Sequence, residues 1–302
     1  MKPRAVAVVG PTATGKSDLA AELARRLDGE VVNADAMQLY RGMDIGTAKL
    51  PLAARREVRH HLLDTLEVTE TASVAVYQRA AHHVMEELLA AGRVPVLAGG
   101  SGLYVRAVLD DLDFPGTDPG VRAALEAELA EHGAPALYRR LHRLDPVSAG
   151  RILPSNERRL VRALEVIQLT GRPFAAALPQ PAATRYGAVL IGLDTDPAML
   201  DTRVDARVNR MFAAGLIEEV HQLLARGLRE GATASRALGY QQILAALDAG
   251  TDPACAADPT ARATRRFVRR QRSWFRRDDR IRWLDAHRCD LVDAALSVTV
   301  NG

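Results

Sequence analysis

A glycine-rich segment near the N-terminus has the residue types and spacing of a phosphate-binding loop. Four residues separate Gly10 from the triplet Gly15, Lys16 and Ser17. In such a loop backbone N–H groups surround phosphate oxygens at a helix N-terminus, the lysine adds charge, and the serine hydroxyl can bind Mg²⁺. The pattern indicates a diphosphate or triphosphate and does not specify a nucleotide. The expected diphosphate-binding residues are Gly10, Pro11, Thr12, Ala13, Thr14, Gly15, Lys16 and Ser17.

Two further polar residues follow predicted strands. Asp35 comes at the end of GEVVNAD, and Ser101 follows Gly99-Gly100 at the end of RVPVLAGG. Ligands of open parallel sheets bind at the carboxyl ends of the strands, so Asp35 could be a general base or metal ligand and Ser101 a hydroxyl contact. A turn or helix cap is the alternative for Asp35, and a plain turn for the glycine pair. A nucleotide hydrolase would hold Mg²⁺ with an aspartate at the end of an apolar strand, but RVPVLAGG ends in glycines. Only Asp194, at the end of a later predicted strand, could take that role.

Two arginines at helical spacing could bind one anion. Arg203 and Arg207 lie four residues apart, which places them on one face of a predicted helix. Asp201 and Asp205 offer the alternative of a solvent-exposed ion-pair face. The adjacent histidines at 60 and 61 lack metal-ligand spacing with other residues, so we expect them to be structural.

Arginines and aromatic residues alternate near the C-terminus. The segment RRFVRRQRSWFRRDDRIRW, residues 265–283, has the composition of a nucleic-acid-binding surface. An amphipathic helix whose aromatic side chains face the core would give the same pattern. The sequence of this segment alone does not choose between them.

Strands that alternate with helices predict an α/β fold with a parallel sheet flanked by helices. We expect strands at 6–9, 29–35, 93–100, 186–194 and 281–285, and a helix over 72–91. Asp-Pro pairs at 196–197 and 258–259 predict the starts of two more helices, the first reaching about residue 226. Residues 112–185 have helical patterns without a convincing strand. The predicted domains are a phosphate-loop core, 1–111 and 186–302, which includes the C-terminal helices, and a helical insertion, 112–185.

Composition limits the class of protein. The 302 residues are 48% hydrophobic and 25% charged, as in soluble globular proteins, and no apolar run approaches the roughly 18 residues of a membrane span. The N-terminal apolar stretch leads directly into the phosphate loop, so we expect no signal peptide. Two cysteines are too few for a disulfide framework or a thiolate zinc site. We expect a cytoplasmic monomer with no membrane partner.

Six segments together resemble the tRNA dimethylallyltransferases, also called isopentenyltransferases. They are spread over nearly the whole chain in the family's order, and DIGTAK at 44–49 is specific to the family. The segments are GPTATGKS from Gly10, DAMQLYRGMDIGTAK from Asp35, GGSGLY from Gly99, ERRLVRALEV from Glu157, ALGYQQI from Ala237 and RRQRSWFRR from Arg269.

The resemblance implies a kinase-like phosphate-loop fold and an activity. The family transfers a dimethylallyl group from dimethylallyl diphosphate to N6 of the adenosine beside the tRNA anticodon, on its 3′ side, and releases diphosphate. By resemblance, Asp35 is the base, Ser101 a hydroxyl near the reacting centre, Arg207 a diphosphate ligand, and Ser17 the residue that binds Mg²⁺. The implied tRNA contacts are Asp35, Ala36, Met37, Gln38, Ser101, Arg122, Arg158, Arg159, Leu160, Val161, Arg162, Arg236, Gly239, Tyr240, Gln241, Arg269, Arg270, Gln271, Arg272, Trp274 and Arg276.

Two positions depart from the family pattern. Ala36 stands where serine is common, which removes a polar group, and Ser101 stands where threonine is usual, which keeps the hydroxyl.

Three other functions remain to be distinguished: an adenylate isopentenyltransferase, a nucleoside or nucleotide kinase that uses ATP, and a non-catalytic RNA-binding protein. The helical insertion and the arginine-rich segment argue against a small acceptor, and the intact loop argues against a purely binding role.

Overall fold

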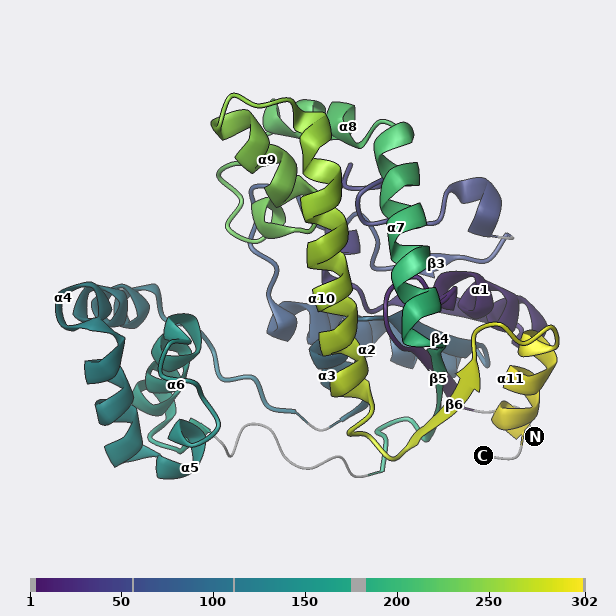
Figure 1. Ribbon diagram of the computed structural model, residues 1–302. Helices are drawn as coiled ribbons and strands as arrows, with labels where there is room; N and C mark the ends of the chain where they lie inside the picture. The colour runs from purple at the N-terminus through teal and green to yellow at the C-terminus, as the bar shows by residue number, and fades with distance from the viewer. Residues whose placement is uncertain (1–3, 56, 111, 175–182, 301–302) are drawn as a thin grey trace. The chain divides into compact units, whose positions relative to one another are not determined.

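The computed structural model describes residues 4–55, 57–110, 112–174 and 183–300. These residues form two compact units, one within 4–109 and 183–300 and the other within 110–174. The first unit contains a six-stranded parallel sheet in the order β3-β2-β4-β1-β5-β6, which confirms the predicted α/β fold (Figure 1). Its strands are β1 Ala5–Val9, β2 Gly29–Asn33, β3 His60–His61, β4 Val94–Gly99, β5 Ala188–Asp194 and β6 Ile281–Asp285.

Helices cover both faces of this sheet because its central strands are apolar on both sides. In β1 all five residues are buried, and alternate side chains enter different cores. Val6 and Val8 pack with α1 Lys16–Leu27 and α11 Leu291–Val300. Val9 and its neighbours pack with α2 Val74–Ala90 and α3 Gly102–Leu109.

A further group of helices follows β5. It comprises α7 Pro197–Ala213, α8 Leu216–Leu224, α9 Tyr240–Asp248 and α10 Ala257–Phe275. Helices α7 and α10 lie side by side (Figure 1). A separate core joins α8 and α9 to the loop after β2, including Tyr40 and Met43. These helices therefore support the loops at the carboxyl ends of the strands.

The second unit contains α4 Pro119–Leu144, α5 Pro146–Ala149 and α6 Glu157–Thr170. Asp118 accepts a hydrogen bond from Val121 N, and Asn156 caps α6 in the same way, as Asp/Asn helix starts require. Gly133 has a positive φ and Pro135 follows it, so α4 consists of two helical segments joined by a kink. A core of leucines, including Leu125 and Leu160, holds the unit together.

Two details of the predicted helices were wrong, and one short strand was not predicted. The helix from residue 197 does not reach 226, because Gly215 at φ +97° separates α7 from α8. Helix α10 begins at Ala257, before Asp258, and follows a 3₁₀ turn that Asp252 caps. Pro259 fits within the first turn of the helix, because an N–H group there would have no partner in the helix. Residues His60 and His61 form the edge strand β3, and His61 Nε2 lies 2.5 Å from Glu30, so their structural role agrees with expectation. No helix in the described ranges is long and apolar enough to cross a bilayer.

Candidate active site

The phosphate loop connects the central strand β1 to helix α1. Gly10 has φ +135°, and a Cβ atom there would lie 2.2 Å from the carbonyl oxygen of Leu193 in the adjacent strand. Gly15, at φ +83°, is the N-cap of α1. Thr14 Oγ1 donates to the carbonyl of Pro11 across the loop, at 2.9 Å. The backbone therefore needs glycine at both ends, and the N–H groups of the first helical turn are left to face a ligand.

Lys16 lies at the centre of this site in a poorly solvated position. Its Nζ donates to the carbonyl oxygen of Pro11 at 2.6 Å. Burial lowers the pKa of Lys16 to about 7, with the positive charge of Arg207 acting in the same direction and Asp35 in the opposite one. An anionic ligand would restore the full charge of Lys16, as expected of a phosphate-binding lysine.

Asp35 lies between two cavities. Its Oδ1 accepts a hydrogen bond from Met37 N at 3.0 Å and so caps a 3₁₀ turn, Ala36–Leu39. Ser101 Oγ accepts from Ala36 N at 3.4 Å. The capping role weighed for Asp35 is thus present, but it uses one carboxylate oxygen, and the residue also lines both cavities.

The two cavities share one wall and differ in character. A polar cavity of about 310 Å³ contains Lys16 and Ser17, and a second one of about 420 Å³ has apolar side chains, including Met37, Val208, Met211 and Phe267. The residues common to both are Thr12, Asp35, Thr47 and Arg207. A molecule with a diphosphate and an apolar group could occupy both, with its junction at these four residues.

Arg207 comes from α7 and enters both cavities. In the part of the chain that the structure describes, the hydrogen bond found for its guanidinium is a long one, 3.5 Å from Nη2 to the carbonyl of Thr47. Burial lowers the pKa of Arg207, and the charge of Asp35 opposes this. The predicted anion-binding role thus agrees with its position, although Arg203 does not share these two cavities.

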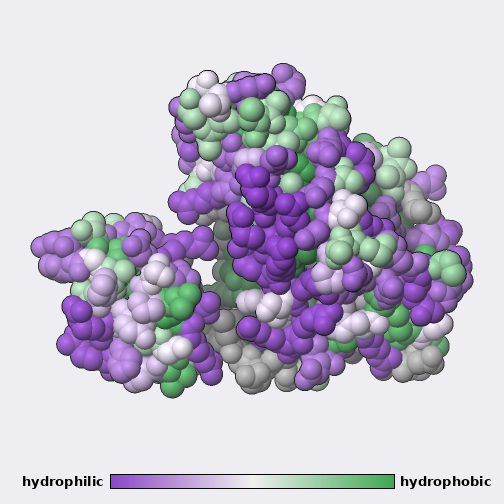
Figure 2. Space-filling model, in the orientation of Figure 1, coloured by the Kyte–Doolittle hydropathy of each residue, from purple (hydrophilic) through white to green (hydrophobic). Residues whose placement is uncertain are grey.

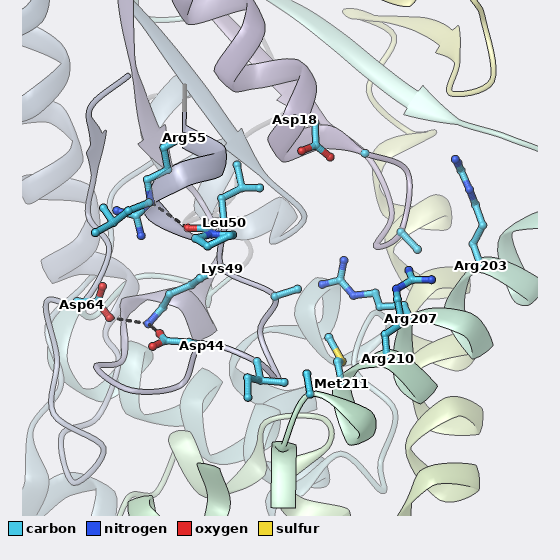
Figure 3. Close-up of a pocket in the computed structure, with 17 residues that line it drawn as sticks. Asp18, Asp44, Lys49, Leu50, Arg55, Asp64, Arg203, Arg207, Arg210 and Met211 are labelled. Carbon is cyan, nitrogen blue, oxygen red and sulfur yellow. Dashed lines mark hydrogen bonds and ion pairs between the residues drawn. The ribbon is translucent and has the colours of Figure 1, made fainter. Parts of the chain in front are cut away.

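Arg203 instead lines a third, more open cavity of about 940 Å³ together with Arg207 and Arg210. Figure 3 shows these arginines on one wall, and Lys49 turned toward Asp44 and Asp64 on the other. The alternative of an ion-pair face along α7 was wrong. Asp201 binds Arg269 at 3.0 Å and Asp205 binds Arg265, so both carboxylates connect α7 to α10.

Gln271 joins the phosphate loop to the loop after β4. Its Oε1 accepts from Thr12 N and its Nε2 donates to the carbonyl of Gly100, both at 2.9 Å. The side chain is buried, which corrects the expectation that it contacts tRNA. A Cβ atom at Gly100 would lie 2.4 Å from Gln271, and one at Gly99 would lie 2.2 Å from the carbonyl of Ala34. Both glycines line the polar cavity, but side chains are excluded at these positions because other protein atoms lie too close.

The arginine-rich helix combines both interpretations of its sequence. Phe275 is buried, Phe267 lines the apolar cavity, and Trp274 packs against Gly102 while 41% of it stays exposed. Arg272 and Arg276 bind the carboxylate of Asp194, at 3.0 and 2.8 Å, and Asp194 lines neither the polar nor the apolar cavity. Figure 2 shows hydrophilic side chains gathered over α10. Its exposed predicted contacts are Arg269, Arg270, Trp274 and Arg276.

Other predicted tRNA contacts divide by burial. Arg158, Arg159 and Arg236 are exposed, whereas Leu160, Val161 and Tyr240 are buried and cannot offer their side chains to RNA. This corrects the expectation for those three, which lie in segments that resemble the family's tRNA-contacting segments. Arg122 and Arg162 both bind the buried carboxylate of Glu165, at 2.5 and 2.7 Å. Arg236 and Gln241 line the apolar cavity with Ala36 and Met37. Gly239, which lies between Arg236 and Gln241 in the sequence, is buried.

A single magnesium ion fits the donor set of the polar cavity. Among the described residues no cluster of three or more His, Cys, Asp or Glu side chains could hold a metal. The Ser17 hydroxyl and Asp35 line the cavity together. Mg²⁺ is commonly bound by one or two protein oxygens plus substrate phosphates, and this site offers that arrangement.

Sequence reasoning did not single out two residues that organise the site. Thr47 lies within DIGTAK, but nothing in the residue type indicates that its carbonyl meets both Gln38 and Arg207. Glu219 is a buried carboxylate in α8. In the sequence its residue type does not distinguish it from the neighbouring Glu218, which is exposed. Apolar neighbours at 216, 220 and 223 were the only signal that its helix face is buried.

These observations define a phosphate-loop α/β protein whose anion site opens into an apolar cavity. A family model described as "IPP transferase" matches residues 38–278, and the chain belongs to this family. It is 69% identical to a tRNA dimethylallyltransferase of Saccharopolyspora erythraea, over 96% of this chain and 94% of that one. A protein of the same name from Mycolicibacterium smegmatis is 58% identical, over 98% of both.

Solved structures agree with this assignment. The tRNA isopentenylpyrophosphate transferase of Bacillus halodurans has a TM-score of 0.72 at 38% identity, and the match covers 99% of this chain and 95% of that one. A eukaryotic dimethylallyltransferase acting on tRNA has a TM-score of 0.81 at 24% identity, over 97% and 76%. The second likeness bears on the fold alone.

Proposed function

We propose that this protein transfers the dimethylallyl group from dimethylallyl diphosphate to N6 of the adenosine on the 3′ side of the tRNA anticodon. The observation that carries the proposal is the junction of the two cavities at Asp35, Thr47 and Arg207. The diphosphate would occupy the polar cavity, and the allyl group and the adenine the apolar one. Family membership and the names of the relatives support the same activity.

The proposed step is a displacement at the allylic carbon. The bond from this carbon to the diphosphate oxygen breaks, its electron pair leaves with the diphosphate, and the N6 lone pair forms the new C–N bond. Loop N–H groups, Lys16 and Arg207 would stabilise the charge on the leaving diphosphate. Asp35 would accept the N6 proton. Mg²⁺ near Ser17 would supply further charge neutralisation when bound.

Positioning has to supply much of the rate, because the N6 lone pair is delocalised into the adenine ring. A base stacked within the anticodon loop cannot reach a buried carbon, so the adenosine would have to be flipped into the apolar cavity. Exposed arginines on α10 and α6 would bind the RNA backbone. In this proposal the protein acts as a monomer, with tRNA and dimethylallyl diphosphate as its two substrates.

The direct test is mass analysis of tRNA after incubation with the protein, dimethylallyl diphosphate and Mg²⁺. We expect one adenosine in the anticodon loop to carry a dimethylallyl group. Three parallel reactions address the alternatives: AMP as the acceptor for an adenylate transferase, ATP with nucleosides for a kinase, and tRNA binding without product for a binding protein. Product with AMP or ATP and none with tRNA would overturn the proposal.

A further inference from the structure

A buried carboxylate in α8 holds the segment that leads to Thr47, one of the residues common to both cavities. Glu219 Oε2 accepts hydrogen bonds from the backbone N–H groups of Asp44 and Ile45, at 3.0 and 2.8 Å. Its Oε1 accepts from Gly46 N at 3.2 Å and from Tyr240 Oη at 2.6 Å. Four donors thus converge on one carboxylate, and the N-terminal turn of α8 that carries it adds a favourable dipole.

The aromatic ring of Tyr240 fixes the same segment sterically. A Cβ atom at Gly46 would lie 2.5 Å from the ring, so residue 46 has to be glycine for the ring and segment to pack. Tyr240 is fully buried, and burial together with the nearby charge of Glu219 raises its pKa well above the usual value. The raised pKa favours the protonated hydroxyl, which donates to Glu219.

The other end of the segment is held by a second set of contacts. Lys49 is buried and its Nζ donates to Asp44, Asp64 and the carbonyl of Tyr40. Residues 44–46 are therefore fixed by Glu219 and residue 49 by its ion pairs, which leaves Thr47 between two anchors. The carbonyl of Thr47 accepts from Gln38 Nε2 at 3.1 Å and from Arg207 Nη2 at 3.5 Å.

We propose that Glu219, assisted by Tyr240, is a positioning residue for Arg207. It acts through the amides of residues 44–46 and the carbonyl of Thr47, and so determines where the Arg207 guanidinium meets the diphosphate. This inference rests on the proposed function only in taking a diphosphate as the ligand of the polar cavity. Tyr240 accordingly belongs to the support of the site, not to the RNA-binding surface.

The experiment compares Glu219→Gln with Glu218→Gln, a matched control in the same helical turn. The carboxylate of Glu218 accepts only from Gln222 among described partners, at 3.3 Å on the exposed side of α8. The amide that Glu219→Gln introduces would present an NH₂ group toward N–H donors, so the segment would shift. We expect pyrophosphate with Mg²⁺ to bind Glu219→Gln about tenfold more weakly, roughly the effect of 1.4 kcal/mol, and Glu218→Gln with native affinity.

A double-mutant cycle with Arg207→Gln separates positioning from general damage to the fold. If Glu219 acts through Arg207, Glu219→Gln should weaken pyrophosphate binding little in the Arg207→Gln protein. Additive losses, or native pyrophosphate affinity in folded Glu219→Gln, would overturn the inference. If Glu219→Gln does not fold, Tyr240→Phe removes one of the four hydrogen bonds and is judged by the same cycle.

The coupling between Glu219 and Arg207 in pyrophosphate binding can be measured without the tRNA acceptor. Pyrophosphate binding requires no tRNA, so a wild-type protein that fails to prenylate tRNA but shows the coupling would refute the proposed function and support the role of Glu219. A wild-type protein that prenylates tRNA without the coupling would do the reverse. In an active protein, we also expect Glu219→Gln to raise KM for dimethylallyl diphosphate while KM for tRNA stays native.

Discussion

Thr12 N and Gln271 Oε1 are 2.9 Å apart, so the phosphate loop is hydrogen-bonded to the arginine-rich helix α10. The same side chain reaches Gly100 in the loop after β4. One residue near the C-terminus therefore connects the phosphate loop and the loop after β4, which both belong to the N-terminal half of the chain. The helix with the exposed arginines is thereby linked directly to the site of the proposed chemistry.

Replacing Gln271 by alanine should destabilise the protein and loosen the phosphate loop. The substitution leaves Thr12 N and the Gly100 carbonyl without their partner, which should cost about 1–3 kcal/mol of unfolding free energy. Urea unfolding measures this loss, and pyrophosphate binding should weaken as well. Arg262→Ala, at an exposed position of the same helix, is the control and should change both little. Equal stability of the two variants would contradict the bridging role.

The pKa of Lys16 predicts how diphosphate affinity depends on pH. Since this pKa is about 7 in the free protein and a bound anion raises it, the lysine is already charged below pH 7 and binding there is at full strength. Above pH 7 binding must take up a proton, so affinity should fall by up to about tenfold per pH unit.

Calorimetric titration with pyrophosphate at several pH values, in Lys16→Ala and native protein, isolates this effect. The ionisation of pyrophosphate itself is common to both proteins, so the difference between their pH profiles belongs to Lys16. Parallel profiles with a constant offset would show that the lysine stays charged throughout. The substitution should also abolish prenyl transfer, and native protein should neither need nor hydrolyse ATP.

The exposed arginines of the helical insertion should bind tRNA through its phosphates. The double variant Arg158→Ala/Arg159→Ala should bind tRNA more weakly. The slope of log K against log salt concentration should become less steep by roughly one to two, because fewer counterions are released. Pyrophosphate affinity should remain native. Arg162→Ala is a contrasting variant: its partner Glu165 is buried, so we expect loss of stability in the insertion. An unchanged salt slope in the double variant would argue against phosphate contacts at these positions.

Much of the fold was predictable because its signals are local. The strand-loop-helix around Gly10 and Lys16 follows from apolar runs and glycine spacing, and Asp118 and Asn156 mark helix starts by their side chains. The edge strand of His60 and His61 was not predictable, since two residues carry no periodic pattern. The break at Gly215 shows that one glycine in a helical pattern can end the helix.

The site was predictable in its ligand-facing residues but not in their support. Glycine spacing and strand ends indicate Lys16 and Asp35 through local sequence. Gln271 and Glu219 act through contacts with residues more than a hundred positions away, and only the folded chain brings these together. Arginines show the same limit: Arg122 and Arg162 look like RNA ligands in the sequence, and only the fold reveals that both also bind Glu165.

Asp35→Asn provides the most direct test of the proposed mechanism. Asparagine keeps an oxygen that can accept from Met37 N, so the 3₁₀ turn should persist, but the amide cannot accept the N6 proton. Single-turnover prenyl transfer to tRNA should fall by roughly 10²–10⁴. Binding of tRNA and of pyrophosphate with Mg²⁺ should each change by less than about tenfold. A near-native transfer rate would contradict the role of Asp35 as base, and loss of Mg²⁺-dependent pyrophosphate binding would identify it as a metal-site residue instead.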